Sequence, residues 1–126
     1  MMHQIQRTKP FEDTIEFCNS GEVLRIDYRV SITPDFAREA RKLQVKIIDL
    51  QRRSKTEQEF ENLGHAIVDL FELIFGAENT QKIISFYEGD YANMLIDLFP
   101  YLRNTVFEEL NRRTAARIKD LKKQYR

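Results

Sequence analysis

The stretch LFELIFGAENTQKIISFYEGDYANMLIDLFPYL, residues 70–102, decides the fold, because it is the densest run of apolar and aromatic side chains in the chain. Gly76 and Gly89 divide it into three segments. Within each segment, apolar residues recur every three or four positions, as they do along one face of an α-helix. Glycine is common just beyond the end of a helix. The stretch therefore predicts three consecutive helices whose apolar faces contribute to a core.

Four helices are expected in the chain as a whole. Thr33 followed by Pro34 is typical of a helix start, and Thr56 with Glu59 forms a capping box for the next helix. Asp90 is placed to cap the last one. The second helix has the longest apolar stripe, with Phe60, Leu63, Ile67, Leu70, Phe71 and Ile74. The expected helices span residues 34–53, 56–75, 79–88 and 90–120, with a kink at Pro100, which lacks a backbone N–H.

The segment that precedes these helices predicts a β-hairpin over about residues 13–32. Apolar and polar residues alternate on both sides of the Asn19-Ser20-Gly21 cluster, and this period-two pattern around a turn is typical of paired strands. The apolar face of such a hairpin needs a cover, which the helices can provide. The fold class is therefore expected to be mainly α (α+β), with an N-terminal β-hairpin packed on a bundle of about four helices.

Length and composition place the chain among soluble, single-domain proteins. A length of 126 residues predicts one domain, 1–126, with a loose N-terminal arm over 1–12 and a basic helical tail over 111–126. The single cysteine, Cys18, cannot form an internal disulfide, which favours a reducing, cytoplasmic setting. No apolar run is long enough to span a bilayer, so no membrane association is expected.

The charges are distributed unevenly along a chain whose formal net charge is zero. Residues 33–53 carry +3, residues 54–109 carry −8 and residues 110–126 carry +6. An acidic middle and a basic end can attract each other between neighbouring copies, in a head-to-tail contact that repeats. We therefore expect the protein to self-associate, and the association to weaken as salt screens the charges.

A search for catalytic or ligand-binding patterns favours a protein that is not an enzyme. His65 is alone on its helix, and Cys18 has no neighbouring base that would activate it. The EGDY run at residues 88–91 lacks the alternate oxygen ligands of a calcium loop, so its glycine and aspartate are interpreted as a helix end and a helix start. No catalytic residues, no cofactor and no metal site are therefore expected.

Two groups of residues are candidates for contact with a partner. The tyrosines of the dense stretch recur at helical spacing, which is typical of core, but tyrosine is also enriched at interfaces. The basic tail could bind phosphates, although cations are equally favoured at any helix C-terminus and no nucleic-acid motif is present, so a nucleic-acid partner is not favoured. The candidate partner-binding residues are Tyr87, Tyr91, Tyr101, Arg112, Arg113, Arg117, Lys119, Lys122 and Lys123.

Residues 66–110 resemble a known family. The pattern is an apolar helix that ends in Phe-Gly-x-Glu, a short helix with an aromatic-acidic-Gly end, and an acidic-Tyr-x-x-Met-Leu helix that runs into Phe-Pro. The residues that match it are Phe75, Gly76 and Glu78, then Phe86, Tyr87, Glu88 and Gly89, then Asp90, Tyr91, Met94 and Leu95, then Phe99 and Pro100. In this pattern the sequence resembles the C-terminal half of tail assembly chaperones from long-tailed phages and prophages of Gram-positive bacteria.

The resemblance implies a function in virion assembly. Proteins of this family are not enzymes; they bind and solubilise the tape-measure protein in the host cytoplasm and help to bring tail-tube subunits onto it. The expected partners are therefore the tape-measure protein, the tail-tube protein and further copies of the chain. A small nucleic-acid-binding regulator that uses the basic tail remains the alternative.

Overall fold

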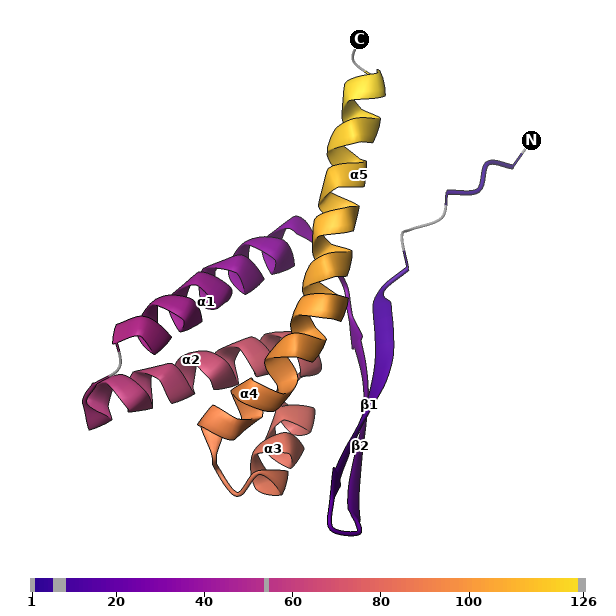
Figure 1. Ribbon diagram of the computed structural model, residues 1–126. Coiled ribbons are helices and arrows are strands. Elements are labelled where there is room, and N and C mark those ends of the chain that lie inside the picture. The colour runs from indigo at the N-terminus through magenta and orange to yellow at the C-terminus, as the bar shows by residue number, and fades with distance from the viewer. Residues whose placement is uncertain (1, 6–8, 54, 125–126) are drawn as a thin grey trace.

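The computed structural model describes residues 2–5, 9–53 and 55–124, so parts of the expected arm (1, 6–8) and tail (125–126) lie outside the described residues. The elements in chain order are β1 (Phe11–Asn19), β2 (Glu22–Val30), α1 (Pro34–Arg53), α2 (Glu57–Phe75), α3 (Ala77–Phe86), α4 (Tyr91–Leu102), the π-helical segment η1 (Arg103–Phe107) and α5 (Glu108–Gln124). The expected mainly α fold with an N-terminal β-hairpin on a helical bundle is confirmed. In Figure 1, α5 extends beyond the other elements at the end of the molecule opposite the hairpin turn.

The hairpin is an antiparallel pair in which Asn19 lies opposite Glu22. Ser20 and Gly21 form the two-residue turn and both have positive φ, 47° and 93°, as the turn that fits the twist of a hairpin requires. β1 begins at Phe11, earlier than expected, so residues 11 and 12 of the predicted arm belong to this strand. On the outer face Arg29 pairs with Glu12 at 2.9 Å.

The helix boundaries follow the predicted capping residues. The Thr56 hydroxyl accepts a hydrogen bond from the Glu59 N–H at 3.2 Å, and the Asp90 carboxylate accepts one from the Asn93 N–H at 3.2 Å. Gly76, with φ of 87°, both ends α2 and begins α3, so the third helix starts at Ala77 rather than at the expected residue 79. These local signals are strong because they satisfy backbone groups that a helix end leaves unpaired.

The predicted kink at Pro100 is replaced by a π-helical segment directly after it. α4 continues through Pro100 to Leu102, and the irregularity lies at Arg103–Phe107. Here the Thr105 hydroxyl donates to the carbonyl of Tyr101 at 2.5 Å. A side chain that binds this carbonyl competes with the regular backbone hydrogen bond, and the helix widens by a residue. The predicted fourth helix is thus α4, η1 and α5 in succession.

The core is one continuous cluster of buried side chains from the hairpin and every helix. α2 and α3 cover the apolar face of the hairpin: the rings of Tyr28 and Phe75 meet edge to face at a centroid distance of 4.8 Å, and Phe17 lies 5.8 Å from Phe86. Phe71 is completely buried. The spacing predicts that Phe60 belongs to the buried apolar stripe of α2, but its side chain is 58% exposed.

Two phenylalanines of α2 provide a direct test of this core. Phe71→Ala should lower the free energy of unfolding by about 3–5 kcal/mol, since it leaves a cavity in a fully buried site. Phe60→Ala should change it by less than about 0.5 kcal/mol. Urea unfolding followed by circular dichroism measures both values, and equal losses in the two variants would contradict the packing described here.

Candidate functional site

Tyr101, a predicted contact residue, lies in a polar cluster between α4 and the hairpin. Its hydroxyl donates a hydrogen bond to the Asp13 carboxylate of β1 and lies 2.7 Å from the hydroxyl of Tyr28 on β2. Asp13 occupies the helix-facing side of its strand between Phe11 and Ile15, and is half-buried. The structure therefore gives Tyr101 an intramolecular role: it joins the helices to both strands.

Burial raises the pKa of the two tyrosine hydroxyls in this cluster, those of Tyr28 and Tyr101. Tyr28 has its pKa raised from the ordinary 10.0 to about 12, chiefly because burial disfavours the phenolate. The pKa of Tyr101 is raised further, first by burial and then by its hydrogen bond to Asp13. These groups therefore remain neutral hydrogen-bonding partners at any physiological pH.

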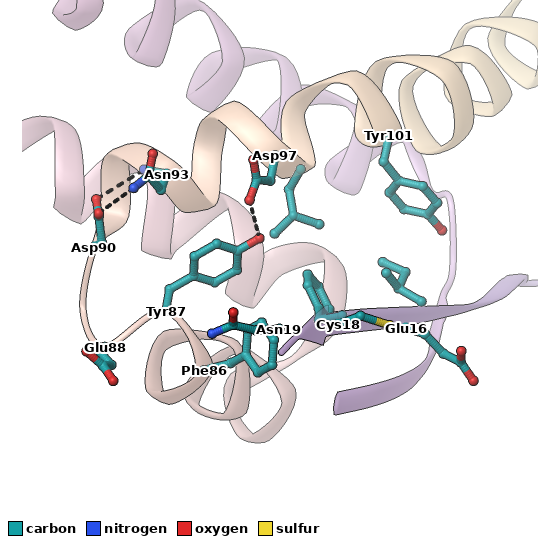
Figure 2. Close-up of a pocket in the computed structure, with 13 residues that line it drawn as sticks. Glu16, Cys18, Asn19, Phe86, Tyr87, Glu88, Asp90, Asn93, Asp97 and Tyr101 are labelled. Atoms are coloured by element: carbon teal, nitrogen blue, oxygen red, sulfur yellow. Dashed lines mark hydrogen bonds between the residues drawn. The ribbon is translucent and has the colours of Figure 1, made fainter. Parts of the chain in front are cut away.

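Tyr87, another predicted contact residue, lines a cavity of about 600 Å³ between β1 and the α3–α4 segment (Figure 2). Its hydroxyl donates to the Asp97 carboxylate at 2.8 Å, and burial followed by this bond raises its pKa. The ring packs on Phe17 and Phe86, at centroid distances of 6.1 and 5.6 Å. One side of the cavity is thus aromatic.

The cavity lining also includes four carboxylates. The carboxylates that line it belong to Glu16, Glu88, Asp90 and Asp97, and no lysine or arginine is among its described lining residues. Asp90 is occupied as the cap of α4, and Asp97 accepts from Tyr87. Glu16 and Glu88 lie at the rim with their carboxylates turned outward in Figure 2, and neither has an ion pair in the described part of the chain.

Tyr91 is the most exposed of the three predicted contact tyrosines. Its side chain is 39% exposed. The ring lies over α2, where a Cβ added at Gly64 would come within 3.0 Å of it. Gly64 therefore provides the space that lets the start of α4 approach α2.

The first half of the basic tail is held by the protein itself. Arg113 donates to the carbonyl of Lys9 at 2.8 Å and pairs with Glu109 at 2.7 Å. Arg117 donates to the carbonyl of Ile32 at 2.7 Å. Arg112 also pairs with Glu109, and these two arginines lower the pKa of the Glu109 carboxyl, with Arg112 as the larger cause. Two of the predicted contact cations, Arg113 and Arg117, therefore anchor α5 to other parts of the chain, whereas Arg112 pairs within the helix.

The second half of α5 is different, because every described residue from 115 to 124 is exposed. The remaining predicted contact residues, Lys119, Lys122 and Lys123, lie here and have no ion pair in the described part of the chain. Ile118 and Leu121 are 51% and 55% exposed. The helix thus presents cations together with an apolar surface that its own fold leaves uncovered.

The residues considered for chemistry lie apart from one another. His65 and Cys18 are exposed on α2 and β1. Among the residues that the structure describes, no group of three or more His, Cys, Asp or Glu side chains is arranged to hold a metal ion. Within the same ranges, no helix combines the length and the apolar character needed to cross a membrane.

Sequence reasoning identified Tyr87 but missed the cavity that surrounds it. Glu16 and Asp97 are far apart in the chain and line the same cavity only because the hairpin packs beside α4. Asp13 was also missed as the partner of Tyr101. Its position on the inward side of a strand, among apolar residues, was the one available signal, because a carboxylate there needs a hydrogen-bond donor.

Comparison with protein-family models, curated proteins and solved structures finds no match to this chain.

The polar cluster between α4 and the hairpin predicts unequal effects of two similar substitutions. Tyr101→Phe should lower the free energy of unfolding by about 1–3 kcal/mol, because it leaves the Asp13 carboxylate without its donor. Tyr91→Phe should change it by less than about 0.5 kcal/mol, because its ring is partly exposed. Denaturant unfolding at neutral pH compares the two, and a larger loss in Tyr91→Phe would count against the cluster.

The raised tyrosine pKa values predict a loss of stability at high pH. A phenol whose pKa is raised by folding contributes stability that is complete below its ordinary pKa of 10.0 and is lost as the pH approaches its folded value, about 12 for Tyr28. The urea midpoint should therefore fall across this interval. In the Tyr28→Phe variant the fall should be smaller. An identical pH profile in both proteins would exclude Tyr28 as a source of the effect.

Proposed function

We propose that this protein is a tail assembly chaperone of a long-tailed phage or prophage, a binding protein rather than an enzyme, which acts in the cytoplasm of its bacterial host. It binds and solubilises the tape-measure protein, helps to recruit tail-tube subunits, and associates with further copies of itself. The observation that carries the proposal is the resemblance over residues 66–110. In the fold, this segment is the second half of α2 with α3, α4, η1 and the start of α5.

The outer surface of α1 is suited to a helical client. The face of this helix that no other described element covers carries Val45 and the half-buried Ile48 between cationic side chains. Val45 is 66% exposed. A client helix could pack its apolar face against this surface, and flanking cations such as Lys42 and Lys46 would add attraction to an acidic client helix.

The nucleic-acid alternative has less support. Phosphate binding needs several free cations, whereas Arg113 and Arg117 are bound to backbone carbonyls and Arg112 to Glu109. The free cations described on the tail are Lys119, Lys122 and Lys123. Retardation of duplex DNA or RNA in a gel at low salt, lost when residues 115–126 are removed, would favour the alternative.

Co-expression tests the chaperone proposal. The long reading frame that neighbours this gene, expressed alone, should give an insoluble product, and co-expression with this protein should move most of it to the soluble fraction. Val45→Asp should reduce the soluble yield severalfold, because it places a charge at the exposed apolar position of α1 that would contact the client. Ile96→Asp, a matched change at a similarly exposed side chain of α4, should leave it unchanged. A client that stays insoluble beside the wild-type protein would refute the proposal.

A further inference from the structure

The end of α5 beyond Arg117 has a surface that its own chain leaves uncovered. This free half of α5 (residues 118–124) forms about 10 Å of helix at 1.5 Å per residue, and it exposes Ile118 and Leu121 beside three lysines. Arg113 and Arg117 hold the first half of the helix against Lys9 and Ile32. Because α5 is thereby fixed in direction, its free half points away from the body of the molecule (Figure 1).

The charge of this helix surface favours an acidic partner. Residues 118–124 hold three lysines and one aspartate, a net +2, so pairing of two such tails would place like charges against each other at a cost in free energy. The cavity beside Tyr87 has the complementary character: it is lined by four carboxylates and has the rings of Phe17, Phe86 and Tyr87 on one side. Aromatic faces and carboxylates together suit the apolar stems and charged ends of lysine side chains.

The same molecule cannot bring the two surfaces together. The cavity lies beside the hairpin turn and the α3–α4 loop, whereas the free end of α5 lies at the opposite end of the molecule (Figure 1). α5 is a continuous helix from Glu108 to Gln124 and does not fold back. The two surfaces can therefore meet only between copies.

We infer that the free half of α5 (residues 118–124) docks across the mouth of the acidic cavity between β1 and the α3–α4 segment of a second copy of the chain. Lys119, Lys122 and Lys123 pair with the carboxylates at the rim of that cavity, Glu16 and Glu88, and Ile118 and Leu121 face its aromatic side. The contact is heterologous, so each copy keeps one free tail and one free cavity, and the association continues into a chain of copies. This inference specifies the self-association named in the proposed function, but it does not depend on the client.

Sedimentation velocity of the purified protein over a range of concentrations and salt tests the inference. At low salt the protein should form a concentration-dependent series of species. Between about 0.1 M and about 1 M salt the association constant should fall by about tenfold or more, because the Debye length falls from about 10 Å to about 3 Å. A monomer at every concentration and salt would overturn the inference.

Two variants, each with the charged side chains of one surface changed to glutamine, test which surfaces form the contact. The cavity variant carries Glu16→Gln and Glu88→Gln, and the tail variant carries Lys119→Gln, Lys122→Gln and Lys123→Gln. None of these side chains has an ion pair in the described part of the chain, so each variant should retain the wild-type circular dichroism. Each variant alone should associate about tenfold more weakly or worse.

Mixing the two variants gives the sharpest result. The intact tail of the cavity variant should bind the intact cavity of the tail variant, and the mixture should stop at a 1:1 dimer because no further pair of intact surfaces remains. A mixture that stays monomeric, or that forms long species, would overturn the head-to-tail geometry. Stronger association of the tail variant alone would indicate tail–tail pairing and would also overturn it.

Matched controls separate this contact from a general effect of charge. Glu57→Gln with Glu72→Gln removes two exposed carboxylates of α2, and Arg52→Gln, Lys55→Gln and Arg103→Gln removes three exposed cations. Both controls should associate like the wild type, and a loss equal to that of the surface variants would overturn the assignment.

Ile118→Ser with Leu121→Ser should weaken association without a change in charge. Client solubility measured in parallel distinguishes the two proposals, because each can fail while the other holds.

Discussion

The structure depends on one constraint: a two-stranded hairpin cannot stand alone in water, so its apolar face must be covered. α2 and α3 provide the cover, with Phe75 against Tyr28 and with Phe86 against Phe17. These two contacts place the Gly76 break between α2 and α3 directly beside the strands. The course of α4 follows, because Tyr101 must reach Asp13 and Tyr28 across the same face.

The candidate contact surfaces arise from the same arrangement. The cavity beside Tyr87 exists because the hairpin turn and the α3–α4 loop project side by side, and carboxylates from both line the space between them. At the other end, Arg113 and Arg117 tie α5 to the residues that flank the strands. The basic end of the sequence thereby lies at the end of the molecule opposite the hairpin turn (Figure 1), and surfaces at two ends of a molecule are the geometry that a repeating contact between copies needs.

Local chemistry explains which features could be predicted from the residues. The Ser20-Gly21 turn, the Thr56 and Asp90 caps and the Gly76 break each depend on neighbours within four positions, and each lies where the pattern indicates. The irregularity expected at Pro100 lies directly after it, in η1, where the Thr105 hydroxyl donates to the carbonyl of Tyr101. Phe60 shows the limit of periodicity: its spacing matches a buried stripe, but burial also requires a neighbouring element.

The sequence by itself therefore determined the elements, their order and the separation of charge along the chain, because capping, turn formation and amphipathic spacing are interactions between near neighbours. It also carried the resemblance on which the proposed function rests. Only the tertiary structure decided that Tyr101 bonds Asp13, that Arg113 and Arg117 bind backbone carbonyls and that Lys119, Lys122 and Lys123 have no ion pair among the described residues. Those outcomes depend on contacts between residues up to 104 positions apart, for which neither periodicity nor composition contains information.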